Sequence, residues 1–299
     1  MGRLEVHARI GRALATLTDA QLAGALTTAT PLGTGIGGAV AAMEVEGAEV
    51  FVKTVRLTDL ERAAANVHST ANLFGLPRCY QYGVSSAGFG AWRELAAHVL
   101  TTGWVTSGAS AAFPLLHHWR VLPRSPTASP DLERQVAAWG GSPAIRTRLT
   151  AIDHASASVV LFLERLPHDL RTWLAAAREV PGWVERELLA VTAFLGARDF
   201  LHFDVHFQNV LTDGHHLYVS DFGQALSSTF TLDADELTFL ERHRDFDRSY
   251  VVMKLFEVTG DPRHAAIAAV MNGFFAQLRA DRAAAFPETE LARAWAART

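Results

Sequence analysis

Hydrophobic residues recur along the N-terminal part of the chain with two different spacings. From residue 4 to residue 27 they follow a helical spacing, which predicts one or two amphipathic helices broken at Thr18-Asp19, an N-cap pair. Residues 39–55 instead form two apolar runs separated by Glu46-Gly47, a pattern typical of two strands joined by a turn. Residues 28–32, TATPL, make a poor strand. The pattern therefore predicts helices followed by a β-hairpin.

The remainder of the chain mixes predicted helices with a few buried strands. Residues 91–105 predict an amphipathic helix, 113–123 a strand, 159–163 a buried central strand, and 183–199 a second long helix. A proline- and serine-rich loop, PRSPTASPDLERQ, leads into a polar helical stretch around 130–155, to which the sequence assigns no role. This combination of elements predicts an α+β protein.

Composition excludes several classes of protein. The 299 residues are 49% hydrophobic and 19% charged, which is typical of a globular chain, and the net charge of −4 favours neither nucleic acid nor an acidic membrane surface as a partner. No stretch approaches the roughly 20 apolar residues of a membrane span. One cysteine and an N-terminus without the apolar core of a signal peptide predict a cytoplasmic protein.

The basic residues are almost all arginine. Of the 27 basic residues, only Lys53 and Lys254 are lysines, which leaves 25 arginines. This preference, together with abundant alanine, is typical of a GC-rich bacterial genome. It also draws attention to each of the two lysines.

The segment LHFDVHFQNVLTDGHHLYVSDFGQA, residues 201–225, carries the strongest candidate chemistry. It contains a carboxylate at Asp204, an amide at Asn209 and a second carboxylate at Asp221, which are the groups that phosphoryl transfer from ATP requires. The turn residues Asp213-Gly214 separate two short apolar runs between Asn209 and Asp221. Because a hairpin returns the chain to its starting point, we expect Asn209 and Asp221 to converge on one metal-sized site.

A glycine-rich run and an isolated lysine precede this segment. Gly33, Gly35 and Gly38 match the pattern GxGxxG, in which glycine lets the backbone approach phosphate oxygens. The hairpin that follows argues against a dinucleotide-binding βαβ unit. Lys53 lies within the apolar strand VFVKTV, where a buried ammonium needs an anionic partner such as a phosphate; an exposed edge lysine is the alternative.

Together, HFDVHFQN and the DFG that follows it resemble the catalytic loop and the metal-binding motif of the protein-kinase-like superfamily. The resemblance extends from about Gly33 to the helix after DFG. It implies a bilobal fold, with a mainly β N-lobe at 32–165, a mainly α C-lobe at 166–299, and ATP in the cleft between them. Residues 1–31 would form an N-terminal helical extension.

The resemblance also implies roles for individual residues. Asp204 would accept the proton of the acceptor hydroxyl, Asn209 and Asp221 would bind Mg²⁺, and Lys53 would pair with the ATP phosphates. The three glycines would cover those phosphates, and the backbone of a hinge from Glu164 to residue 168 would pair with adenine.

A glutamate should hold Lys53 in such a site, and two candidates exist. Glu61 lies in the first turn of a possible helix capped at Thr58 or Asp59, whereas Glu94 lies early in the better amphipathic helix. The helix quality favours Glu94. In that case residues 57–90 are an insertion, and residues 122–156 also lie outside the resemblance.

Several neighbouring residues carry weaker expectations. His202 should be a buried structural residue under the loop, and either Asp245 or Asp247 should support the loop from below. The place of the arginine that reads a phosphorylated activation loop in many protein kinases is taken by Phe203.

Other polar residues outside the loop are expected to be structural. His168 and Asp169 should cap a helix. His215-His216 should be an exposed turn rather than a metal site, because no further ligands are near in sequence.

The acceptor is the least determined part of the interpretation. His206 stands where protein Ser/Thr kinases commonly have lysine and many small-molecule kinases have histidine, although a packing role is equally compatible with it. No Ala-Pro-Glu motif follows DFG. Both features favour an aminoglycoside-phosphotransferase-like enzyme acting on a small hydroxylated metabolite or antibiotic.

A protein Ser/Thr kinase is the alternative. A nucleotide-binding pseudokinase is disfavoured because Lys53, Asp204 and Asp221 are all present.

Overall fold

The computed structural model describes residues 2–35, 38–83, 86–126, 129, 131–177 and 179–298. The chain divides into two compact units. Unit 1 comprises Met1–Leu76 and Ser85–Arg165, and unit 2 comprises Pro77–Val84 and Leu166–Thr299. A short piece of the region expected to belong to the N-lobe, Pro77–Val84, is thus part of unit 2. The fold contains both helices and an antiparallel sheet, as the α+β prediction requires.

Unit 1 is built on a five-stranded antiparallel sheet with the strand order β1-β2-β3-β5-β4. The strands are β1 (Thr30–Gly35), β2 (Gly38–Val45), β3 (Ala48–Leu57), β4 (Leu116–Pro123) and β5 (Ala157–Glu164). The helices of this unit are α1 (Arg3–Thr16), α2 (Asp19–Thr27), α3 (Asp59–Arg62), α4 (Ala91–Thr106), α5 (Leu132–Ala138) and α6 (Pro143–His154).

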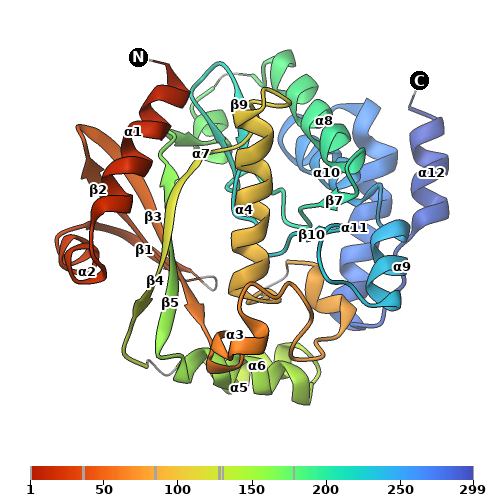
Figure 1. Cartoon of the computed structure of the whole chain (residues 1–299). Helices are drawn as coiled ribbons and strands as arrows, with labels where there is room; N and C mark the ends of the chain where they lie inside the picture. Colours follow the sequence, from red (N-terminus) through yellow and green to blue (C-terminus); the bar gives the residue numbers. More distant parts are fainter. Residues whose placement is uncertain are drawn as a thin grey trace. The chain divides into compact units, whose positions relative to one another are not determined.

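Helices cover both faces of this sheet (Figure 1). Alternate residues of β5 point to opposite faces: Leu161 packs in the cluster that contains Leu95 of α4, and Phe162 in the cluster that contains Leu14 of α1. Burial on both sides explains why residues 159–163 form an uninterrupted apolar run rather than an alternating one. The predicted central strand is therefore confirmed.

The N-terminal helices are an integral layer of unit 1. Thr18 caps α2 by accepting a hydrogen bond from the Gln21 main-chain N–H, at the predicted break. Ile10, Leu14 and Leu22 are completely or almost completely buried against the sheet. The apolar face of these helices therefore forms part of the core of unit 1.

Residues 28–32 differ from the prediction, since β1 begins at Thr30 and includes Pro31. The strand lies at the edge of the sheet, and its pairing with β2 shifts register between Pro31 and Gly33. An edge position tolerates proline because only one side of the strand needs hydrogen-bond donors. The turn at Glu46-Gly47 is present as predicted, and both residues have positive φ.

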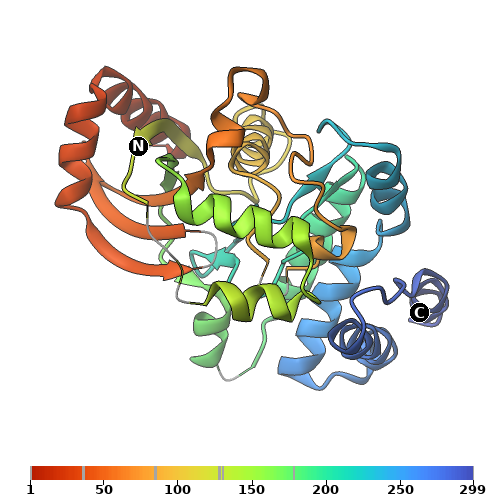
Figure 2. The same ribbon diagram turned by 90° about the horizontal axis from the view of Figure 1, so that it is seen from below.

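The polar stretch around 130–155 forms α5 and α6, which pack together (Figure 2). Arg148 of α6 is 2% exposed and its Nη1 donates to Oε2 of Glu61 at 2.8 Å. Glu61 also accepts from the main-chain N–H of Ala91, the first residue of α4, at 2.7 Å. This buried carboxylate therefore ties α6 to the start of α4.

Unit 2 is mainly helical, with small antiparallel pairings. Its helices are α7 (Leu170–Ala175), α8 (Gly182–Gly196), α9 (Ala234–Arg242), α10 (Phe246–Thr259), α11 (Ala265–Ala280) and α12 (Glu288–Ala296). Its short strands are β6 (His168–Asp169), β7 (Phe200–Leu201), β8 (Val210–Thr212), β9 (Leu217–Val219) and β10 (Leu226–Ser227), paired as β6-β8-β9 and β10-β7.

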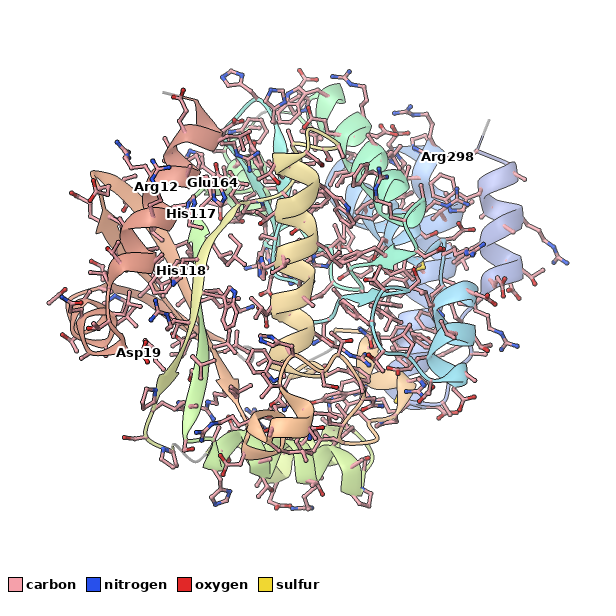
Figure 3. All side chains as sticks on the ribbon, in the orientation of Figure 1. Arg12, Asp19, His117, His118, Glu164 and Arg298 are labelled. Carbon is pink, nitrogen blue, oxygen red and sulfur yellow. The ribbon has the colours of Figure 1, made fainter. Side chains whose placement is uncertain are left out.

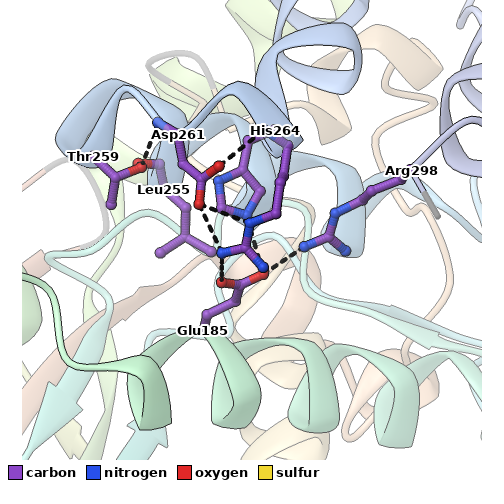
Figure 4. A network of polar contacts seen from close by, with 7 residues as sticks. Glu185, Leu255, Thr259, Asp261, His264 and Arg298 are labelled. Atoms are coloured by element: carbon purple, nitrogen blue, oxygen red, sulfur yellow. Dashed lines mark hydrogen bonds and ion pairs between the residues drawn. The ribbon is translucent and has the colours of Figure 1, made fainter.

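A polar network fixes the last helix to the rest of unit 2 (Figure 4). Glu185 of α8 accepts hydrogen bonds from His264 and Arg298, and its second oxygen accepts from Arg263. Asp261 accepts from the side chain and the main chain of Arg263. The network joins the C-terminal end of α12 to α8 and to the turn between α10 and α11.

Among the described residues, no helix is both long enough and apolar enough to span a membrane.

Two arginines on α6 provide a test of the buried ion pair. Arg148→Ala should lower the free energy of unfolding by about 3–5 kcal/mol, because it leaves the Glu61 carboxylate buried without its cation. Arg146, two residues earlier, forms an exposed ion pair with Glu133, and Arg146→Ala should lower the free energy of unfolding much less, because solvent screens this pair. Urea unfolding of both variants measures the difference, and equal losses would contradict this account of Glu61.

Candidate active site

The loop from His202 to Asn209 is held from below by a fully buried carboxylate. Asp247 of α10 is 2% exposed, and its two oxygens accept from the main-chain N–H groups of His202 at 2.6 Å and Phe203 at 2.9 Å. Burial raises the pKa of Asp247 to about 6, although both hydrogen bonds oppose that rise. Of the two acids proposed as the support, Asp247 has this contact, whereas Asp245 forms an ion pair with Arg248.

The loop is strained at Phe203, whose φ is 63°. The ring compensates by packing in the core of unit 2, 4.9 Å from the Phe246 ring and stacked on Phe239. An arginine at this position would place a charge in that aromatic core. The departure from arginine noted in the sequence is thus a packing feature.

His202 has the structural role expected of it. Its ring is completely buried, Nδ1 accepts from the Asp204 main-chain N–H at 3.2 Å, and Nε2 lies 2.8 Å from the Ser220 carbonyl oxygen. One neutral tautomer, with its proton on Nε2, satisfies both contacts. The ring therefore links the Asp204 loop to the residue that precedes Asp221.

Asp204 and Asn209 are in direct contact. The Asn209 side-chain amide donates to the Asp204 main-chain oxygen at 3.0 Å and to Asp204 Oδ2 at 3.2 Å. The Asp204 side chain remains 24% exposed, so its carboxylate is held but reachable. Because both contacts use the amide nitrogen, the Asn209 Oδ1 is turned away from Asp204 and can act as a ligand for a hard cation.

The hairpin prediction is confirmed, and it brings the ends of the segment together. Strands β8 and β9 pair with Val210 opposite Val219, and the Asn209 carbonyl oxygen accepts from the Ser220 main-chain N–H at 2.8 Å. Asp221 follows immediately, with a φ of 63° and an exposed side chain. Phe222 is completely buried against Phe200. The buried ring anchors the point from which the Asp221 carboxylate projects.

Lys53 and Glu94 form a buried ion pair in unit 1. Lys53 Nζ lies 2.6 Å from Glu94 Oε1, and the two residues are 5% and 3% exposed. The alternation of β3 accounts for the contact, since Phe51, Lys53 and Val55 share the face that α4 covers. Glu94 lies in the first turn of α4, where the helix dipole favours a negative charge.

Glu61, the alternative partner, is committed to Arg148 and to the N-terminus of α4. The preference for Glu94 is thus confirmed. Glu61 instead positions the helix that carries Glu94.

The three glycines of the GxGxxG run lie in the β1–β2 hairpin, where Gly35 pairs with Gly38. Gly38 has a clear steric requirement: its φ is 137°, and a Cβ there would overlap the main-chain oxygen of Thr54. Gly33 has no neighbour within 4 Å of such a Cβ. Residues 36 and 37, which belong to the same run, lie outside the described residues.

The side chain and the main-chain N–H of Glu164 have partners within unit 1, and the pairing of the hinge backbone with adenine stays a prediction. Its carboxylate accepts from Arg3 Nε at 2.7 Å and from the Leu115 main-chain N–H at 3.0 Å. Its own N–H donates to the Leu115 carbonyl oxygen at 2.8 Å. Glu164 lies beside α1 and His117 (Figure 3), and it serves to fasten the N-terminal helix to the end of β5.

Comparisons of the whole chain with protein-family models and with curated proteins found no match. The assignment of the site therefore depends on its own geometry.

His206 lies beside the Asp204 carboxylate. Burial lowers its pKa, while the negative charge of Asp221 acts in the opposite direction. Its Nδ1 accepts from the Gln208 main-chain N–H at 3.3 Å, and its Nε2 lies 3.7 Å from Asp204 Oδ2. Because Nδ1 accepts a hydrogen bond, the proton of the neutral ring is on Nε2, which faces the Asp204 carboxylate.

The remaining polar candidates have structural roles. Asp169 caps α7 by accepting from the Thr172 main-chain N–H. His215 and His216 are exposed in a turn that Asp213 closes through their main-chain N–H groups. Within the part of the chain that the structure describes, no three His, Cys, Asp or Glu side chains are grouped to hold a metal ion.

Sequence reasoning missed the part that Arg3 plays at Glu164. A residue near the N-terminus and one 161 positions later share no local pattern, so no sequence signal connects them. Arg3 is the first residue of the amphipathic helix α1, and its position there does not by itself indicate a partner.

A pH titration tests the burial of Asp247. Because its folded pKa is raised above the ordinary value of 3.8, its contribution to stability is complete below pH 4 and is lost as pH rises through 6. The unfolding free energy of the wild type minus that of Asp247→Asn should fall by about 3 kcal/mol between pH 4 and pH 7. Urea unfolding at several pH values measures this difference. A difference that is constant with pH would show that the carboxyl group does not titrate in this way.

Proposed function

We propose that this chain is a Mg²⁺-dependent phosphotransferase that moves the γ-phosphoryl group of ATP to a hydroxyl of a small molecule. In this proposal the fold is bilobal and protein-kinase-like, with unit 1 as the N-lobe and unit 2 as the C-lobe. The observation that carries the proposal is the arrangement of Asp204, Asn209 and Asp221 around a short hairpin, with Asp204 and Asn209 in direct contact.

The chemistry follows from the contacts of each side chain. The Asp204 carboxylate is partly exposed and is oriented by Asn209. Asp204 is therefore suited to align an acceptor hydroxyl and to take the proton of that hydroxyl during attack. Phosphoryl transfer needs little covalent participation by the protein, and positioning and charge stabilisation supply most of the acceleration. The rigid support under the loop, from Asp247 and His202, suits that requirement.

Unit 1 offers a complementary group for the nucleotide. Lys53 is almost fully buried and is oriented by Glu94, which fixes the ammonium on a rigid strand. Such a lysine is suited to pair with phosphate oxygens of ATP. The proposal requires that Lys53 and the Asp204 loop act on the same nucleotide.

The donor set of the hairpin fits magnesium. Asn209 Oδ1 and the exposed Asp221 carboxylate are hard oxygen ligands, and Mg²⁺ is usually held by one or two carboxylates together with substrate phosphates and water. A site of this kind needs no cluster of three acidic or histidine side chains. When bound, the cation would neutralise the charge of the phosphates.

The region after Asp221 supports a small acceptor. Only residues 222–233 separate it from α9, which begins at Ala234, and β10 pairs with β7 within that stretch. This leaves little chain with which to build a platform for an extended peptide. The neutral His206 beside Asp204 is also compatible with a small polar acceptor.

Substitution of Asp204 tests the proposed base. Asp204→Ala should lower kcat for phosphoryl transfer by at least about 100-fold while leaving ATP affinity nearly unchanged. Turnover with labelled ATP and calorimetric binding of ATP measure the two quantities. Asp235→Ala, which alters an exposed acid in the first turn of α9, is the control and should retain activity. Wild-type turnover by Asp204→Ala would refute the role of the base.

The acceptor is tested by incubating the protein with labelled ATP and Mg²⁺ in the presence of aminoglycosides and other polyols, and separately with a cell lysate. We expect label on a small molecule. Label found only on proteins would establish the protein kinase alternative, and ATP binding without transfer to any acceptor would identify a pseudokinase.

A further inference from the structure

A short segment within the predicted insertion at residues 57–90 is anchored in unit 2. This strap, Pro77–Gly83, includes a single 3₁₀ turn at Arg78–Gln81. Arg78 forms an ion pair with Asp233 at the N-cap of α9, at 2.5 Å. The buried Gln81 side chain donates to the Gln224 main-chain oxygen, three residues beyond Asp221.

Tyr82 is the central anchor of the strap. It is 5% exposed, and its hydroxyl lies 2.7 Å from Nε2 of His243. Its ring contacts the Phe203 ring of the loop edge-on and lies against Phe246 of α10. The strap is thereby packed on the same aromatic cluster that holds the Asp204 loop.

The next residue, Gly83, touches the proposed base. A Cβ added to Gly83 would lie 2.8 Å from Asp204 Oδ1 and 2.9 Å from Asp204 Cγ, closer than side chains tolerate. Its φ is 61°, in the left-handed region that favours glycine. The anchors at residues 78, 81 and 82 leave the strap little freedom to retreat from such a clash.

We propose that Gly83 is a positioning residue for Asp204, and that the strap forms one wall of the acceptor site. The carboxylate occupies the space that a side chain at position 83 would fill. Gly83 bounds it on the Oδ1 side, and Asn209 holds it on the Oδ2 side. The two contacts together fix the direction in which Asp204 meets an acceptor hydroxyl. This inference rests on the proposed function, in which Asp204 is the base.

A matched pair of glycine substitutions separates this role from backbone strain. Gly260 has a φ of 63° and lies in unit 2, but nothing lies within 4 Å of a Cβ placed there. Gly83→Ala and Gly260→Ala therefore introduce similar left-handed strain, whereas only Gly83→Ala displaces the Asp204 carboxylate.

The unfolding midpoints of the full chain, measured in urea, test the contact. Gly83→Ala should lower the midpoint more than Gly260→Ala does. In an Asp204→Ala background most of this excess should disappear, because the oxygen and Cγ atoms that would clash are gone. Equal decreases for the two glycine variants, or an excess that persists without the carboxylate, would overturn the proposal.

Steady-state kinetics test the positioning role. Gly83→Ala should lower kcat about 100-fold with the KM for ATP nearly unchanged, because a displacement of about 1 Å at the base disrupts alignment without affecting nucleotide binding. Gly260→Ala should have nearly wild-type kcat. A Gly83→Ala kcat equal to that of Gly260→Ala would refute positioning. The urea measurements require no turnover, so a protein without phosphotransfer activity would refute the proposed function and still leave the contact to be judged by the midpoints.

Discussion

The hydrogen bonds from two main-chain N–H groups to the buried Asp247 carboxylate are the interaction on which the candidate site depends. They fix His202 and Phe203, and Phe203 is held in a left-handed conformation that costs free energy. With these two residues fixed, His202 reaches Ser220 and Asp204 meets Asn209. A buried carboxylate is itself costly, as its raised pKa shows. Both costs are concentrated at one loop, as is usual for functional sites.

Unit 1 shows a related use of buried charge. Lys53 and Glu94 form one buried pair, and Glu61 and Arg148 form another. The second pair supports the first, because Glu61 also binds the N-terminal N–H of the helix that carries Glu94. Buried ion pairs contribute little net stability, but they tolerate few alternative arrangements. Here they determine where α4 begins relative to β3, and so where the lysine is held.

Local sequence patterns were sufficient to predict much of the architecture and part of the candidate site. The alternation in β3 placed Lys53 on an interior face, the turn at Glu46-Gly47 was readable, and the hairpin between Asn209 and Asp221 followed from its turn residues. Pro31 was misleading, because whether a strand lies at the edge of a sheet is a property of the assembled sheet. The contact between Glu164 and Arg3 was not predicted, since the two residues are far apart in the sequence.

The sequence by itself determined the secondary-structure elements and the chemical groups of the candidate site. The spacing of apolar residues and the identity of turn residues are local features, and the candidate acids, the amide and the lysine follow one another in the order of a known motif. Only the tertiary structure decided which groups meet. It selected Glu94 for Lys53 and Asp247 for the loop, and it placed Gly83 against Asp204, 121 residues away. The reason is physical: contacts between distant segments depend on how the apolar faces of helices and strands pack, and that packing is a property of the whole core rather than of any local pattern.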